Sequence, residues 1–270
     1  MVIIATTAGI FALVVLIVTA AVFLLAMALR DNSIMDIAYG PTFLIATVAT
    51  IWLTESFGLL PLVATVLVAL WSARLGVRIL HKNFGKPEDA RYAAWRGNWQ
   101  ARGQLYFIIR SYLQIYVLQG IIISIVALPV IFMIANPFIF NLWSLALGVS
   151  VWLIGFGIEA IADWQLDRFI ARKKAGNETA ELLTTGLFRY SRRPNYFGES
   201  LLWWGMALIV LPLPYGYLAL IGPLLITYIV TKVTGPMLER IFLEQYPDEY
   251  RAYMETTSYF IPWPPEKPVA

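Results

Sequence analysis

The 270-residue sequence contains no cysteine and one histidine, His81. Disulfides, thiolate nucleophiles and cysteine-ligated metals are therefore excluded, and little room remains for a histidine-rich metal centre. Only 14% of the residues are charged, whereas 59% are hydrophobic and the mean hydropathy is +0.69. This composition predicts an integral membrane protein. The net charge of +3 is too small to indicate a nucleic-acid partner.

Apolar segments long enough to cross a membrane recur along the chain, since a span needs about 20 such residues. We expect spans at about 3–29, 34–54, 57–80, 108–134, 138–162, 197–211 and 215–234. The first run has no basic leader and is too long for a signal peptide, so we interpret it as a retained helix. The predicted fold is all-α: one domain, residues 1–270, with about seven transmembrane helices.

Lysine and arginine residues lie at the ends of these spans or in every second connection between them. All 20 of them, Lys267 included, fall on one side of a seven-helix topology, and the loops containing TESFG, ANPF and LPLPYG carry none. The positive-inside rule then places the N-terminus outside and the C-terminus in the cytoplasm.

Three carboxylates follow one another at the end of the fifth predicted span, in EAIADWQLDRF. Glu159, Asp163 and Asp167 are spaced i, i+4, i+8, which aligns them on one helical face. An acid inside a membrane is a candidate functional residue, and we favour function for Glu159 and Asp163. For Asp167 we favour simple pairing with nearby arginines.

The segment RYSRRPNYFGES precedes the sixth predicted span. Pro194 suits the first turn of a helix, so we expect that helix to begin there. Free N–H groups at such a start, beside arginines, favour phosphate or carboxylate. Asn195 and Glu199 are i, i+4 and can bind an amide or a ribose hydroxyl. The alternative is a positive-inside anchor with an interfacial tyrosine, Tyr196.

The loop HKNFGKPEDARYAAWRGNWQARGQ combines cations with aromatic residues. Its arginines can clamp a pyrophosphate, and Tyr92, Trp95 and Trp99 can stack on a base. Equally, the loop can lie on anionic lipid.

Polar residues also occur near three other helix ends. Asp36 and Tyr39, i, i+3 in NSIMDIAYG, are candidate proton donors, although a helix N-terminal acid is an ordinary feature. Arg74 is a snorkelling cation or a phosphate ligand. Glu239, followed by Arg240, lies in an expected cytoplasmic helix and can either stabilise the fold or close over a cofactor.

Four of these motifs, in this order, resemble the steroid 5-alpha-reductase-like membrane family, and its bacterial branch in particular. They are DIAYG with EDARYAAWR, EAIADWQLDRF, ELLTTGLFRYSRRPNYFGESLLWWGMAL and GPMLERIFLEQYPDEYRAYMETTSYFIPW. The resemblance implies a multi-pass inner-membrane protein of lipid metabolism, with NADPH bound at the cytoplasmic ends of its helices. It places the cofactor-binding part at about 74–110 and 155–270.

The resemblance also implies roles for individual residues. This chain also departs from the family: Asp36 and Tyr39, the catalytic residues expected from their own chemistry, stand where steroid reductases have a Gln-Glu pair, Trp71 stands near the family's catalytic tyrosine, and Arg193 replaces a usual histidine. The expected cofactor-binding residues are Glu159, Asp163, Arg189, Tyr190, Arg192, Arg193, Asn195, Tyr196, Glu199, Arg91, Arg96, Arg102, Arg74 and Glu239.

The function expected from the sequence is NADPH-dependent reduction of a conjugated C=C bond in a steroid-like or polyprenoid substrate. Membrane lipid is an expected partner. We expect no metal, no nucleic-acid partner and no obligate protein partner. One alternative is an S-adenosylmethionine-dependent methyltransferase, because RRPNYFGE, ER and EQYPDEY are also similar to isoprenylcysteine carboxyl methyltransferases. A third is a non-catalytic transporter or lipid-binding protein.

Overall fold

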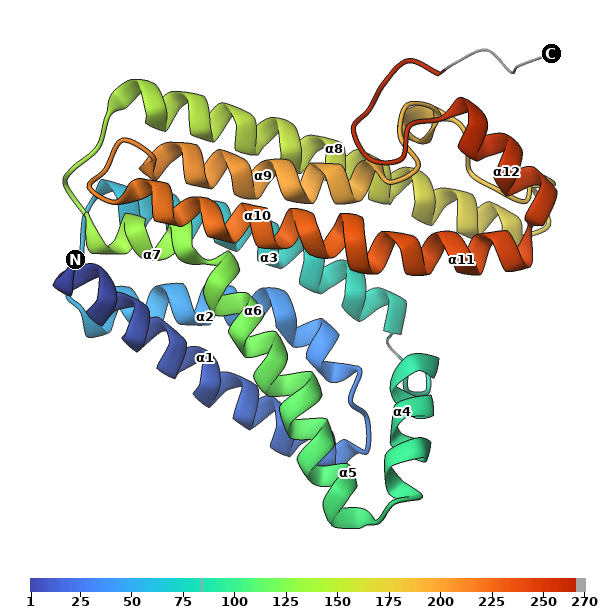
Figure 1. Ribbon diagram of the computed structural model, residues 1–270, viewed down its shortest axis with the longest axis horizontal. Coiled ribbons are helices and arrows are strands. Elements are labelled where there is room, and N and C mark those ends of the chain that lie inside the picture. Colours follow the sequence, from blue (N-terminus) through green and yellow to red (C-terminus); the bar gives the residue numbers. More distant parts are fainter. Residues whose placement is uncertain (84, 266–270) are drawn as a thin grey trace. The chain divides into compact units, whose positions relative to one another are not determined.

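The computed structural model describes residues 1–83 and 85–265, so Lys267 lies outside the described residues. Every regular element in that part of the chain is helical, which confirms the all-α prediction. The contacts divide the chain, drawn in Figure 1, into two compact units, and the single domain expected from the sequence stays a prediction. The first unit is Met1–Asn141 with Val210–Ile221, and the second is Leu142–Ile209 with Gly222–Ala270. The predicted cofactor-binding part is therefore distributed over both units.

The first unit contains α1 to α7. Their bounds are α1 Val2–Leu29, α2 Ile34–Leu53, α3 Leu59–Asn83, α4 Ala90–Gln100, α5 Gln104–Ser111, a π-helical segment Tyr112–Val117, α6 Leu118–Val126 and α7 Leu128–Ala135. Helix α1 packs on α2, α6 and α7, and α3 packs on α2 and α7. The span predicted at 108–134 is divided at Ala127, because Pro129 in the first turn of α7 has no N–H to continue the preceding helix.

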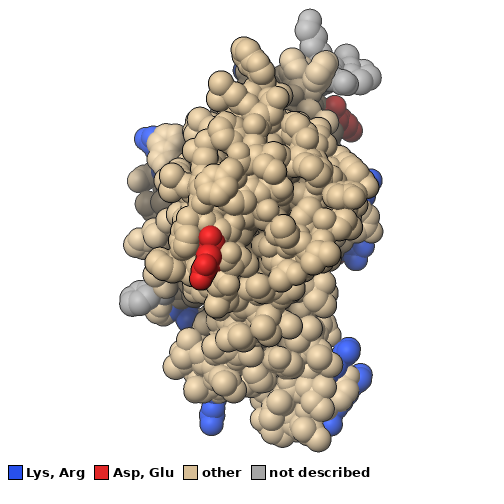
Figure 2. All heavy atoms as spheres, turned by 90° about the vertical axis from the view of Figure 1, so that its left-hand side faces the viewer, with Lys and Arg blue, Asp and Glu red and all other residues tan. Residues whose placement is uncertain are grey.

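Three loops of the first unit meet at one end of it (Figure 1). Ser56 Oγ donates to the Ile134 carbonyl, and a Cβ added at Gly58 would lie 2.4 Å from the Pro137 carbonyl oxygen. A turn of 3-10 helix, Gly216–Leu220, packs on α7 there. Figure 2 shows mainly uncharged residues at this end, with Lys and Arg towards the margins. The inside or outside location of this end remains a prediction.

The second unit contains α8 Leu142–Lys174, a 3-10 turn Gly186–Arg189, α9 Pro194–Val210, α10 Ile221–Tyr228, a π-helical segment Ile229–Thr234, α11 Gly235–Gln245 and α12 Pro247–Thr256. Helices α8, α9 and α10–α11 run side by side (Figure 1). Trp204 Nε1 on α9 donates to Thr227 Oγ1 on α10 at 3.1 Å. Helix α9 begins at Pro194, as predicted.

Glycines bring α8 and α9 into backbone contact. A Cβ added at Gly148 would lie 2.5 Å from the Gly205 carbonyl oxygen, and one added at Gly155 would lie 2.6 Å from the Leu202 nitrogen. Gly198 and Gly205 are equally confined on the α9 side. Small residues at a crossing allow this approach, which is how helices associate in membranes.

Among the described residues, six helical stretches are long and apolar enough to cross a membrane, so the chain is a multi-pass membrane protein. They are Val2–Leu29, Ile34–Leu53, Leu59–Asn83, Gln104–Val126, Leu142–Lys174 and Gly216–Gln245. The sixth predicted span, 197–211, corresponds to α9, whose 17 residues rise about 26 Å, less than the roughly 30 Å of a hydrocarbon core. Seven spans are therefore not confirmed, and the last span continues through α11 instead of ending near residue 234.

We expect Gly155→Ala to destabilise the second unit by about 1–3 kcal/mol, because the added methyl group overlaps the α9 backbone. Gly157→Ala is the matched control on the same helix, since a Cβ there meets nothing within 4 Å. Thermal unfolding in detergent compares the two variants. Equal melting temperatures would contradict the proposed crossing.

Candidate functional site

Two of the three α8 carboxylates are inside the second unit. Glu159 and Asp163 are each 4% exposed, whereas Asp167 is exposed. Asn195 Nδ2 donates to Asp163 Oδ1 at 3.2 Å. The structure thus brings together two residues that the sequence placed on separate helices.

The glycine crossing explains why these side chains meet. A Cβ added at Gly198 on α9 would lie 2.6 Å from the Glu159 nitrogen, so the two helix backbones touch at the level of the acids. Asn195 lies one turn before Gly198, at the start of α9. Tyr196 and Glu199 are half-buried on the same helix.

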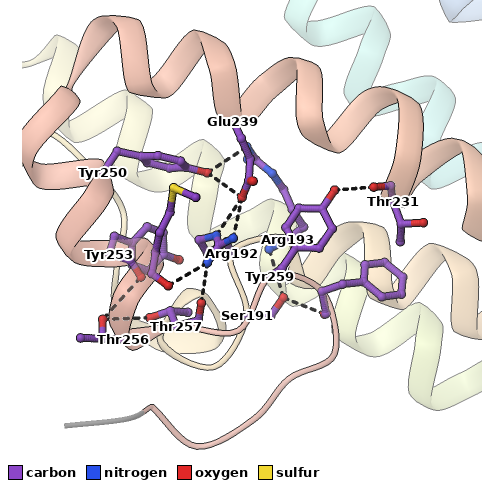
Figure 3. Close-up of polar contacts among 12 residues, drawn as sticks. Ser191, Arg192, Arg193, Thr231, Glu239, Tyr250, Tyr253, Thr256, Thr257 and Tyr259 are labelled. Carbon is purple, nitrogen blue, oxygen red and sulfur yellow. Dashed lines mark hydrogen bonds and ion pairs between the residues drawn. The ribbon is translucent and has the colours of Figure 1, made fainter. Parts of the chain in front are cut away.

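Arg192 is buried and is held by protein groups on each of its guanidinium nitrogens (Figure 3). Its Nε and Nη2 atoms lie 2.8 Å from Glu239 Oε1. Its Nη1 donates to the carbonyls of Met254 at 3.1 Å and Thr257 at 2.7 Å. Arg192 therefore links Glu239 to the C-terminal segment, as a structural clamp. Few of its N–H donors remain for a cofactor, so its role in cofactor binding stays a prediction.

Further hydrogen bonds attach the segment that follows α12 to the segment that precedes α9. The Arg192 amide donates to the Ser258 carbonyl at 2.8 Å, and Ser191 Oγ donates to the Phe260 carbonyl at 2.8 Å. The Tyr253 hydroxyl donates to the Phe188 carbonyl, and burial raises the pKa of this phenol. The C-terminal segment is therefore a fixed part of the site (Figure 3).

Arg193 differs from Arg192 in having a donor to spare. Its Nη2 lies 3.4 Å from the Tyr250 hydroxyl, and its guanidinium lies over the Phe242 ring at 5.2 Å. Its Nε is buried and has no hydrogen-bond partner. Arg189 and Tyr190 are exposed, and the Tyr190 carbonyl accepts from the Trp263 amide at 2.9 Å. Arg193 thus has a buried N–H that donates to no acceptor, unlike Arg192.

Asp36 in the first unit is the acceptor in a compact polar cluster. The Tyr92 hydroxyl donates to Asp36 Oδ1 at 2.6 Å, and Arg91 Nη2 lies 3.1 Å from Oδ2. Burial raises the pKa of Tyr92, so its phenol stays protonated. The sequence suggests Tyr92 as a base-stacking residue, and no spacing or motif connects it to Asp36.

A second set of contacts attaches α4 to the turn between α1 and α2. Glu88 forms an ion pair with Arg96 Nε at 2.8 Å and accepts from the Asn32 amide at 2.7 Å. The Tyr116 hydroxyl donates to Asn32 Oδ1 at 3.1 Å. Arg91 and Arg96, both predicted phosphate ligands, are therefore engaged with carboxylates.

The remaining predicted residues of the first unit are Tyr39, Arg74 and Arg102. Tyr39 packs edge-on against Phe43 and Trp71, at ring distances of 5.3 and 6.3 Å. Two guanidinium nitrogens of Arg74 are shielded from solvent on α3. Arg102 is exposed and donates to the Tyr106 hydroxyl at 3.2 Å. No cluster of three or more potential metal ligands occurs among the described residues.

We expect Glu239→Gln to destabilise the protein by about 3 kcal/mol or more, because it leaves the buried Arg192 guanidinium without its counter-charge. The control is Asp248→Asn, which removes a carboxylate from the exposed Arg251 pair at 4.0 Å. Melting in detergent and limited proteolysis of the C-terminal segment measure both. If Glu239→Gln behaves like the control, the clamp is not a major source of stability.

Low pH should weaken α4. Asp89 accepts from the Arg91 amide and side chain, and the hydrogen bond to that side chain holds the pKa of this carboxyl below its usual 3.8. Its stabilising contribution is therefore present above about pH 4 and lost as the pH falls through the lowered pKa. Because exposed pairs contribute at most about 1 kcal/mol, we expect up to about fivefold lower hydrogen-exchange protection of α4.

Asp89→Asn supplies the comparison, since asparagine also caps helices but carries no charge. Its α4 protection, corrected for intrinsic exchange rates, should change less between pH 6 and pH 3 than that of wild type, because Asp36 and Glu88, the other carboxylates that contact α4, are present in both proteins. A wild-type change no larger than that of the variant would contradict the assignment.

Comparison with known proteins adds a family and one relative. The chain is 26% identical over 226 residues to an uncharacterized protein of Schizosaccharomyces pombe, covering 74% of this chain and 63% of the relative. The chain thus spans less than two thirds of that protein's length. No solved structure matches it. Residues 22–257 match the family described as protein of unknown function (DUF1295), and the chain therefore belongs to that family.

Proposed function

We propose that this protein is an NADPH-dependent membrane reductase of a conjugated C=C bond in a lipophilic substrate. The observation that carries the proposal is the hydrogen bond between the buried Asp163 and the half-buried Asn195, with the buried Glu159 one turn away, where two apolar helices touch. Burial of such groups is costly, and polar groups retained inside membrane helices commonly bind ligands. The motif resemblance to steroid 5-alpha-reductase-like proteins supports the same reading.

The donor set of the second unit suits a dinucleotide phosphate. Carboxylate and amide groups at Asp163 and Asn195 can hold an amide or ribose hydroxyls. Arg193 offers a buried N–H without an acceptor, as a phosphate ligand would need. When bound, NADPH would supply the hydride that adds to the β-carbon of an enone.

The first unit contains the groups suited to supply the proton that the reduction consumes. Tyr92 donates its hydroxyl hydrogen to Asp36, so a proton lies between these two oxygens, and Arg91 balances the carboxylate charge. An acid of this kind can polarise a carbonyl or protonate the α-carbon of the substrate. Tyr39 remains the alternative donor. Apolar helices exclude water from such a reaction.

We expect NADPH to stabilise the detergent-purified protein by about 2.7 kcal/mol at 100 times its dissociation constant. Asp163→Asn and Arg193→Gln should each weaken binding about tenfold or more, because each loses a hydrogen bond to or from a charged group. Asp167→Asn is the control, since this carboxylate is exposed on the same helix. Thermal shift and native mass spectrometry give the affinities.

The same samples separate the competing functions. Stabilisation by S-adenosylmethionine and not by NADPH would replace the reductase with a methyltransferase. Binding of neither compound would favour a transport or lipid-binding role. Asp36→Asn should leave the NADPH affinity unchanged while abolishing substrate-dependent NADPH oxidation, and a retained reaction rate would exclude the Tyr92–Asp36 pair as the proton source.

A further inference from the structure

A polar pocket lies near the C-terminal end of α8, within the second unit. Its volume is about 320 Å³, at the lower end of the roughly 300–1,000 Å³ found for small-ligand sites. The residues that matter for its chemistry are Trp164, Arg168, Arg172, Glu178, Thr185 and Gly186.

This pocket is on the opposite side of α8 from the buried acids. At 100° per residue, Arg168 and Arg172 lie about 140° and 180° around the helix from Asp163. Glu159 lies within about 40° of Asp163. The pocket is therefore separate from the Asp163–Asn195 pair, and the proposed reductase chemistry does not use it.

The loop that closes the pocket is attached to α8. The Leu187 amide donates to Gln165 Oε1 at 2.9 Å. Gly186 has φ of 64°, and a Cβ there would lie 2.6 Å from the Gln165 side chain, so the loop backbone lies against the helix. The pocket wall is thus a defined piece of backbone.

The charge inside the pocket is positive. The Arg168 guanidinium lies over the Trp164 ring at 5.4 Å, and Arg172 pairs with Glu178 at 3.4 Å. The lining thus contains two guanidinium groups and one carboxylate. Thr185 adds a hydroxyl to the lining. This combination suits a phosphate, which accepts hydrogen bonds from arginine in bidentate geometry.

Two exposed tryptophans place the pocket at the level of a membrane surface. Trp143 is 83% exposed and Trp164 is 58% exposed. They are 21 residues apart on one helix, a rise of about 31 Å, which matches the roughly 30 Å of a hydrocarbon core. Tryptophan is enriched at both interfaces of a membrane, so Trp164 and the adjoining pocket lie among lipid headgroups.

An apolar ridge leads along α8 to this pocket. Leu147, Ile154 and Ile161 are spaced by seven residues and are 56%, 57% and 50% exposed. Arg168 is the next position of the same series. The ridge lies about 160–200° from Asp163, so it shares the pocket's side of the helix.

We propose that this pocket binds the headgroup phosphate of an acidic phospholipid, whose acyl chains lie along the ridge formed by Leu147, Ile154 and Ile161. The cations attract the anionic headgroup, Trp164 sets its depth, and the ridge meets the acyl chains. A free phosphate would satisfy the arginines but would leave the ridge without a function. The inference does not depend on the reductase, since neither NADPH nor turnover enters it.

Native mass spectrometry can test the pocket with defined lipids. Purified protein is mixed with equal amounts of phosphatidylglycerol and phosphatidylcholine, and the ratio of the two bound lipids is measured. We expect wild type to prefer phosphatidylglycerol, and Arg168→Gln or Arg172→Gln to lower that preference about tenfold. Arg168→Lys keeps the charge and should retain part of it.

Lys174→Gln is the matched control, because Lys174 is an exposed cation of the same helix that does not line the pocket. An equal loss in this variant would show unspecific attraction to a basic surface and overturn the proposal. Wild type without a preference would also overturn it, whatever the variants do. Competition with inorganic phosphate provides a further test. If millimolar phosphate displaces phosphatidylglycerol as effectively as added lipid does, the acyl chains contribute nothing to binding and the proposal is overturned.

Discussion

The backbone contact between α8 and α9 determines the arrangement of the second unit. Four glycines, spaced by seven residues on each helix, remove the side chains that would separate the two backbones. Without a hydrophobic driving force inside the bilayer, such close contact is a main source of helix association. It also sets the distance between Asp163 and Asn195, so the candidate cofactor residues depend on positions that carry no chemistry themselves.

The arginines next to this contact divide into structural and available groups. Arg192 has acceptors at all three of its nitrogens, which satisfies the strong requirement that a buried charge be paired. Arg193, its neighbour in sequence, keeps a buried N–H without an acceptor. Two adjacent residues of the same type therefore have different roles, and burial and partners distinguish them where sequence does not.

Some features could be predicted from the sequence because they depend on local pattern. Apolar length predicts the spans, Pro194 marks the start of α9, and the i, i+4 spacing of Glu159 and Asp163 predicts their shared buried face. The Tyr92–Asp36 hydrogen bond joins residues 56 positions apart, and no periodicity encodes such a contact. The count of spans depends on α9, whose length is close to the minimum that a membrane requires.

Helix α8 shows why the polar residues near its end were difficult to assign from sequence. Acids and arginines alternate closely there; Arg172 pairs with Glu178 in the following loop, and Arg168 stacks on Trp164. Glu159 and Asp163 lie about 140–180° around the helix from Arg168 and Arg172. A helix with polar groups on both sides near one end has no single polar face. The α8 sequence is therefore best explained by two separate surfaces, one facing the interior of its unit and one facing lipid.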